Sequence, residues 1–134
     1  MTPFKLNFQV RDYELDMLGM VNNAVYQNYL EHSRHEFLKS LGVDFAAMYT
    51  EGYRLVVRRA ELDYHFTLSS GDKFYVETSL KRISRIKFEF NQCIILEENQ
   101  KPVLTGKIIG TALNERGRPS FPKSWEKIFP EIEK

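Results

Sequence analysis

An acidic residue stands just upstream of a possible helix start in the stretch YELDMLGMVNNAVYQNY, residues 13–29. Asp16 is followed by Gly19, which permits a tight turn, and by Asn22 and Asn23, either of which can cap a helix. The backbone N–H groups at a helix N-terminus attract negative charge. Two interpretations are open at this point: a surface carboxylate that complements the helix dipole, or a catalytic carboxylate beside a substrate pocket.

The residues that follow predict one long helix over 23–41. Gly42 comes directly after this segment and is a typical helix stop, and Lys39 would lie in the last turn. The helix would have about five turns, enough for the main helix of a small domain. Its buried face is predicted from steps of three or four residues and consists of Tyr26, Leu30, Ser33, Phe37 and Leu41.

Alternating apolar and polar residues predict strands on both sides of this helix. Short turns at 69–72, 82–85 and 97–102 favour antiparallel pairing, and a bulge is expected near 55–59. The predicted strands are 4–12, 60–68, 74–81, 86–96 and 103–113.

The last of these strands carries Gly106 and Gly110 on its apolar face, which indicates that something bulky, the long helix, approaches closely. The predicted fold is therefore α+β: an antiparallel sheet of about five strands wrapped around one long central helix. Sheet surface and edges would stay uncovered, which favours oligomerisation. The tail, 121–134, is expected to be a short surface segment that packs Trp125 and Phe129 on the body.

Composition narrows the class of protein. The chain has 134 residues, which predicts a single domain over 1–134, and 43% hydrophobic with 28% charged residues is typical of a soluble globular protein. A net charge of +1 argues against nucleic-acid binding. Neither a signal peptide nor an apolar run that could cross a membrane is visible, so we expect a cytoplasmic protein without membrane association.

The pattern D-x-x-G-x-V-N-N-A-x-Y-x-x-Y runs from Asp16 to Tyr29, with Arg34 further along. It resembles the hotdog-fold thioesterases of the 4-hydroxybenzoyl-CoA thioesterase type, and the predicted order of elements is similar to that fold over residues 4–120. The form in this chain looks closest to plastid acyl-ACP thioesterases and related bacterial acyl-CoA or aryl-CoA thioesterases. Many relatives carry His where this chain has Met20, so that His has no counterpart here.

The resemblance implies hydrolysis of an acyl or aroyl thioester to the free acid and coenzyme A. Asp16 would be the catalytic carboxylate, either as nucleophile or as general base on water. The backbone amides of residues 22–24 would stabilise the oxyanion, and Asn23 is a second catalytic candidate. The other residues expected to bind substrate at this end are Gly19, Val21, Asn22, Ala24 and Tyr26.

The phosphates of coenzyme A would need cationic partners. Arg82, Arg85 and Lys87 bracket a predicted strand turn, where they could bind these phosphates or form the solvated end of a hairpin. The resemblance further implies a homodimer or homotetramer with the active site at a subunit interface. The phosphate-binding residues could then come from the neighbouring chain.

Two alternatives to this function stay open, and two further kinds of site are not supported by the sequence. The carrier could be acyl-ACP instead of coenzyme A, or the protein could bind acyl thioesters without hydrolysing them. No metal or redox cofactor is expected, because His32 and His35 lie three residues apart on the helix without further matching ligands. Cys93 lies in a predicted strand, and no G-x-S-x-G motif is present, so Ser or Cys catalysis is not supported.

Overall fold

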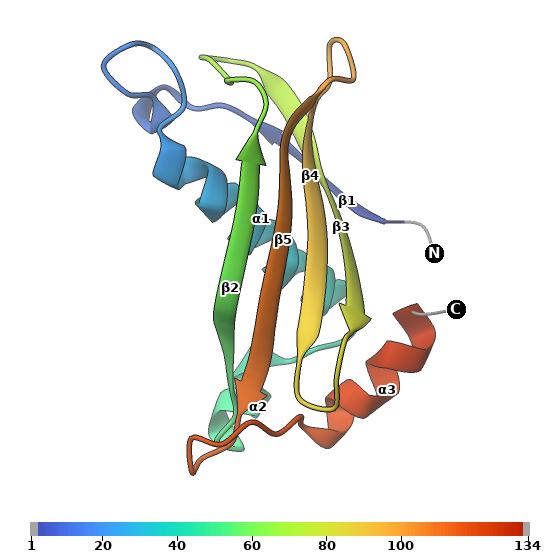
Figure 1. Ribbon diagram of the computed structural model, residues 1–134. Helices are drawn as coiled ribbons and strands as arrows, with labels where there is room; N and C mark the ends of the chain where they lie inside the picture. Colours follow the sequence, from blue (N-terminus) through green and yellow to red (C-terminus); the bar gives the residue numbers. More distant parts are fainter. Residues whose placement is uncertain (1–2, 133–134) are drawn as a thin grey trace.

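The computed structural model describes residues 3–132, and most of the predicted elements are present in it (Figure 1). A short 3-10 turn, η1 (Asp12–Glu14), links the first strand to the loop that carries Asp16. The remaining elements are β1 (Phe4–Gln9), α1 (Asn23–Ser40), α2 (Phe45–Thr50), β2 (Arg54–Tyr64), β3 (Lys73–Arg82), β4 (Phe88–Leu96), β5 (Pro102–Leu113) and α3 (Lys123–Ile132).

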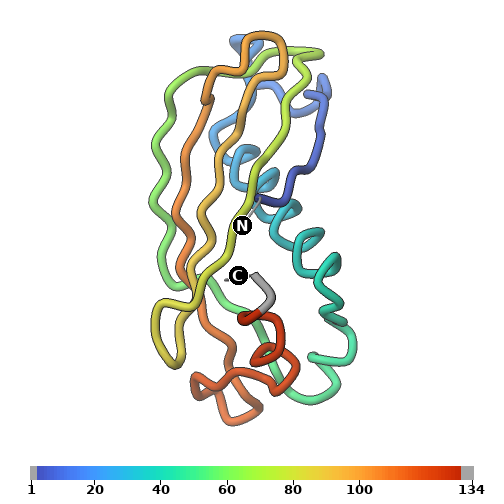
Figure 2. Tube along the Cα trace, turned by 90° about the vertical axis from the view of Figure 1, so that its right-hand side faces the viewer, coloured from blue at the N-terminus to red at the C-terminus, as the bar shows by residue number. Residues whose placement is uncertain are grey.

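The strands form one antiparallel five-stranded sheet in the order β1-β3-β4-β5-β2. Figure 2 shows α1 along one face of this sheet, with α3 at the end where the β3–β4 turn lies. The predicted architecture is therefore confirmed. The bulge is also confirmed, because the register between β2 and β5 shifts between Val57 and Arg59.

The second predicted strand ends earlier than the sequence suggested. β2 stops at Tyr64, and the amides of His65 and Phe66 both donate to the carbonyl of Val103. Leu68 is buried, but it contacts the start of α1 instead of continuing the strand. The alternation of apolar and polar residues over 60–68 continues past the end of the strand, because the segment after Tyr64 runs from the sheet to the helix and still buries Leu68.

The two glycines of β5 have different neighbours. A Cβ at Gly106 would lie 3.4 Å from a Leu30 methyl group, which confirms the close approach of α1. A Cβ at Gly110 would lie 2.8 Å from the ring of Phe88 and 2.7 Å from the carbonyl oxygen of Val56. The prediction was wrong at Gly110, where the bulky neighbour is an aromatic ring of the adjacent strand.

Two helices were not predicted. Asp44 caps α2 by accepting a hydrogen bond from the amide of Ala47. α3 replaces the expected surface segment, although the predicted packing of its aromatic residues is confirmed: Trp125 is fully buried and Phe129 is 3% exposed. None of the helices in residues 3–132 is long and apolar enough to cross a membrane.

Candidate active site

The loop between η1 and α1 folds back on itself around Gly19. The amide of Asp16 donates to the carbonyl of Met20 (2.7 Å), and the amide of Gly19 donates to the carbonyl of Asp16 (3.2 Å). Gly19 has φ +78°, a left-handed conformation that strains other residues. The predicted turn at this glycine is thus confirmed.

Only one oxygen of the Asp16 carboxylate is used to hold this loop. Oδ1 accepts hydrogen bonds from the amides of Leu18 (2.8 Å) and Met20 (3.1 Å). Within residues 3–132, Oδ2 has no hydrogen-bond partner, and the side chain is exposed. The loop therefore fixes the orientation of the carboxylate and leaves one oxygen available for chemistry.

The three backbone amides expected to form the oxyanion site differ in whether they already donate a hydrogen bond within the protein. The amide of Asn22 donates to the carbonyl of Glu14 (3.0 Å), and the amide of Ala24 donates to Oδ1 of Asn22, the helix cap (3.0 Å). The Asn23 amide has no partner in the described part of the chain, as is usual in the first turn of a helix. Asn23 N–H is therefore the one of these three donors that can meet a ligand without breaking an existing hydrogen bond.

The segment after β2 clamps the start of α1. The amide of Val21 donates to the carbonyl of Leu68 (2.9 Å), and the amide of Leu68 donates in turn to the hydroxyl of Tyr26 (2.9 Å). Val21 is 2% exposed and Tyr26 is 1% exposed. Val21 and Tyr26, which the sequence predicted to bind substrate, thus help to position the loop.

Removing the Tyr26 hydroxyl tests this clamp. We expect Tyr26→Phe to lower the free energy of unfolding by about 1–3 kcal/mol, because the buried amide of Leu68 would lose its acceptor. Chemical denaturation of both proteins measures the difference. Tyr49→Phe is the control, since Tyr49 is 70% exposed, and a loss of equal size in that variant would contradict the assignment.

Two side-chain contacts near this site were not predicted from the sequence, although Tyr29 belongs to the motif. The hydroxyl of Tyr29 donates to Oε1 of Glu14 (2.8 Å), which ties η1 to α1; burial and this hydrogen bond raise the pKa of Tyr29. Tyr64, at the end of β2, donates to the carbonyl of Asn23 (3.4 Å), and its ring stands edge-on to that of Tyr26. Such contacts join segments far apart in the sequence, and no local pattern indicates them.

Unlike the other predicted phosphate-binding residues, Arg82 has a side chain that is already engaged, in part by a hydrogen bond to the carbonyl of Arg85 (2.7 Å). Its guanidinium forms an ion pair with Glu126 of α3 (2.7 Å) and lies 4.7 Å from the centre of the Phe121 ring. Arg82 therefore connects α3 to the sheet. Arg85 and Lys87 are exposed in the β3–β4 turn.

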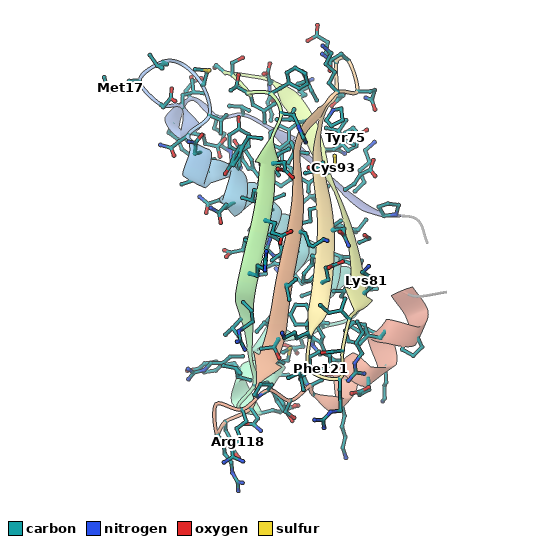
Figure 3. All side chains as sticks on the ribbon, viewed as in Figure 1. Met17, Tyr75, Lys81, Cys93, Arg118 and Phe121 are labelled. Atoms are coloured by element: carbon teal, nitrogen blue, oxygen red, sulfur yellow. The ribbon has the colours of Figure 1, made fainter. Side chains whose placement is uncertain are left out.

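Within one chain, the basic turn and the Asp16 loop lie at opposite ends of the sheet. Figure 3 shows Met17, in the Asp16 loop, at one end, with Phe121 and Arg118 toward the other. The structure thus brings together the predicted residues from Asp16 to Tyr26, and it does not bring Arg85 and Lys87 to them.

Two hollows border α1 in the described part of the chain. The larger, about 740 Å³, opens between β1 and α1 and is lined by several polar side chains, among them Asn28 and His32. The smaller, about 100 Å³, lies between α1 and β2, and its lining is mostly apolar. Asp16 lines neither, so size alone does not identify the acyl-binding site.

The arrangement at the start of α1 is suited to attack on a polarised carbonyl. As far as the described residues show, a carboxylate with one unengaged oxygen lies on the loop that leads to an unengaged amide at a helix N-terminus. The carboxylate can act as nucleophile or base, and the amide, aided by the helix dipole, can stabilise an oxyanion.

Comparison with solved structures supports the fold. Over 98% of both chains, the structure is similar to that of a 1,4-dihydroxy-2-naphthoyl-CoA thioesterase from Synechocystis, with a TM-score of 0.89 and 17% identity. A DHNA-CoA thioesterase from Staphylococcus aureus gives a TM-score of 0.90 at 20% identity, over 99% of this chain and 92% of that one. These likenesses confirm the hotdog fold that the sequence motif implied.

Sequence comparison finds nearer relatives. The chain is 39% identical over 126 residues to the chloroplastic acyl-acyl carrier protein thioesterase ATL3 of Arabidopsis thaliana, covering 93% of this chain and 66% of that protein. It is 38% identical over 116 residues to ATL2 of the same plant, covering 87% of this chain and 62% of that protein. The chain thus spans less than two thirds of the length of either relative. Residues 10–129 match the thioesterase-like superfamily, and we conclude that the chain belongs to this superfamily.

Proposed function

We propose that this protein is a thioesterase that hydrolyses an acyl or aroyl thioester of coenzyme A to the free acid and the thiol. The proposal depends on one observation: within residues 3–132, an unengaged carboxylate oxygen, Asp16 Oδ2, lies on the loop that leads to an unengaged amide, Asn23 N–H, at the start of α1. Membership of the thioesterase-like superfamily supports it.

In the proposed reaction, Asp16 Oδ2 attacks the thioester carbonyl or takes a proton from the attacking water. The amides of Leu18 and Met20 hold Oδ1, so the carboxylate keeps its orientation during the reaction. Negative charge develops on the carbonyl oxygen, and Asn23 N–H donates to it. One such donor contributes about 3 kcal/mol to transition-state stabilisation. The thiolate of coenzyme A then leaves and takes up a proton. On the nucleophilic route this leaves a mixed anhydride between the acyl group and Asp16, which water hydrolyses to release the free acid and restore the carboxylate.

A second copy of the chain would complete the site. β2 is an edge strand of 11 residues, and Val57 and Tyr64 on it are 55% and 47% exposed. Antiparallel pairing of two β2 strands about a two-fold axis would place the Arg54 end of one strand beside the Tyr64 end of the other. The Tyr64 end carries the Asp16 loop, and the Arg54 end is the end of the β3–β4 turn.

This dimer would bring the basic end of one chain to the Asp16 loop of the other. Arg85 and Lys87 are exposed at that end, as are Arg116 and Arg118 in the turn after β5. Basic side chains of one chain could then bind the phosphates of a substrate whose thioester lies at Asp16 of the other. Sedimentation equilibrium tests this arrangement, and a monomer at all concentrations used in the activity assay would contradict it.

Loss of the two exposed cations tests phosphate binding. We expect the double variant Arg85→Ala, Lys87→Ala to raise KM for coenzyme A thioesters severalfold with little change in kcat, because these residues would contact a part of the substrate that does not react. The increase should be larger at low salt than at high salt, since mobile ions screen exposed charges. Lys107→Ala, an exposed cation on β5, is the control. An unchanged KM would identify the turn as a solvated hairpin end.

An assay with the same acyl group attached either to coenzyme A or to acyl carrier protein tests which carrier the enzyme uses. The names of the two plant relatives, both acyl-acyl carrier protein thioesterases, favour acyl-ACP as the second candidate substrate. We expect equimolar release of acid and thiol from the acyl-CoA form. Faster release from the acyl-ACP form would mean that acyl-ACP, and not acyl-CoA, is the substrate. Tight binding of both forms without release from either would show a protein that only binds acyl thioesters.

A further inference from the structure

We propose that the smaller hollow, the cleft between α1 and β2, receives the acyl group, and that Arg34 binds an oxygen atom at the end of that group remote from the thioester. The inference rests on the proposed thioesterase function. It specifies the class of substrate: a long acyl chain that ends in a carboxylate, hydroxyl or carbonyl oxygen, in preference to a plain hydrocarbon chain.

The cleft is lined by an apolar wall and by a single cluster of polar side chains. Its polar side chains are Glu31, Arg34 and His35, all on α1. β2, β4 and β5 supply most of the wall, which would contact a hydrocarbon chain or an aromatic ring. The apolar lining residues include Leu38, Leu55, Phe88, Phe90 and Ile108.

Arg34 is held in place from the sheet side. One guanidinium nitrogen donates to Oε1 of Gln92 (3.0 Å). Gln92 is itself fixed, because its amide nitrogen donates to the carbonyl of Leu30 and to the hydroxyl of Thr78, both at 3.0 Å. Gln92 is 4% exposed and Thr78 is fully buried, so this support is rigid. The head group of Arg34 therefore cannot easily swing out of the cleft.

The guanidinium has more donors than the structure uses. Arg34 carries five N–H donors, and its hydrogen bond to Gln92 goes to a neutral amide oxygen. Among residues 3–132, no carboxylate lies within ion-pair distance of it, although Glu31 lines the same cleft one turn earlier. Burial lowers the pKa of Arg34, and the nearby charge of Glu31 acts in the opposite direction.

A half-buried guanidinium with unused donors can form further charge-assisted hydrogen bonds to a ligand that supplies oxygen atoms. The planar fork of an Arg side chain suits a carboxylate, a hydroxyl or a carbonyl group. Arg34 comes eleven residues after Asn23, which corresponds to about 16 Å along the helix axis. The oxyanion donor and the proposed oxygen-binding cation are therefore separated along the same helix by a distance that only a long acyl chain can span.

Matched pairs of substrates test the inference. The pairs are a long-chain alkanoyl-CoA against the ω-carboxyalkanoyl-CoA of equal length, and the same alkanoyl-CoA against the ω-hydroxyalkanoyl-CoA. We expect Arg34→Met to lower kcat/KM for the oxygen-bearing member of a pair about 10- to 100-fold more than for its plain partner, as for a lost hydrogen bond to a charged group. Lys39→Met, an exposed cation on the same helix, is the control and should not change the ratio.

An equal loss on both members of each pair would overturn the inference, because Arg34 would then have a structural role. An equal loss accompanied by dissociation of the dimer would overturn it too, and would indicate that a carboxylate of a second copy pairs with Arg34.

If the wild type hydrolyses none of these thioesters, the proposed function fails, and calorimetry with the free acids tests Arg34 separately. Tighter binding of the oxygen-bearing acids by wild type than by Arg34→Met would support the inference, and equal binding would overturn it.

Discussion

We expect Asp16→Asn to lower turnover of acyl thioesters by about 10²- to 10⁴-fold, the usual contribution of a positioned acid or base. The Asn side chain keeps an oxygen that can accept from the amides of Leu18 and Met20, so the loop should keep its conformation. It loses the negative charge, which both the nucleophilic and the base-assisted reaction require. Substrate binding should change little, and KM and kcat are measured separately to show this.

Asp12→Asn is the matched control for this substitution. Asp12 is also an exposed acid at this end of the molecule, and its Oδ1 accepts a hydrogen bond from the hydroxyl of Ser70. The same loss of charge at Asp12 should leave turnover within about twofold of the wild type, because a surface substitution away from the reacting atoms has a small effect. A rate of Asp16→Asn equal to that of Asp12→Asn would exclude Asp16 from the reaction.

Trp125→Ala should cause the largest loss of stability. Trp125 is fully buried, its ring centre lies 5.2 Å from that of Phe88, and its indole N–H donates to the sulfur of Met48 (3.3 Å). Truncation of a buried Trp costs about 3–5 kcal/mol. For a domain of this size, the midpoint of thermal unfolding should fall by roughly 10–20 °C. The reason is that this ring joins α3 to α2 and to the sheet.

Two further variants show whether packing is the cause. Trp125→Phe keeps most of the ring volume and should lose less stability than Trp125→Ala. Lys127→Ala changes an exposed side chain of the same helix and should shift the free energy of unfolding by no more than about 0.5 kcal/mol. A loss below about 1 kcal/mol in Trp125→Ala would show that α3 does not contribute to the core.

The elements with local patterns were predictable from the sequence. The long helix was expected over 23–41 and forms at Asn23–Ser40, because the 3.6-residue period and the residues that flank it act within a few turns. The glycine turn after Asp16 was predictable for the same reason. The engagement of the Ala24 amide by the Asn22 side chain follows from ordinary helix capping and limits which donor can serve an oxyanion.

The features that depend on distant contacts were not predictable. α3 contains Pro130 and follows Pro122, which suggested an irregular surface segment. Its helical form depends on tertiary packing of Trp125 and on the ion pair between Arg82 and Glu126, residues 44 apart in the sequence. The same pair changes the interpretation of Arg82, because the sequence shows a basic residue in a turn and gives no sign of its partner.

The measurement that tests the central claim most directly is the release of free thiol by the wild-type protein from a panel of acyl-CoA thioesters, from short to long chains and with aromatic acyl groups. Asp16→Asn is assayed in parallel. We predict saturable release from at least one substrate, with an equal amount of free acid, and loss of this release in Asp16→Asn. Release by Asp16→Asn at the wild-type rate, or no release by the wild type from any acyl-CoA or acyl-ACP, would contradict the claim.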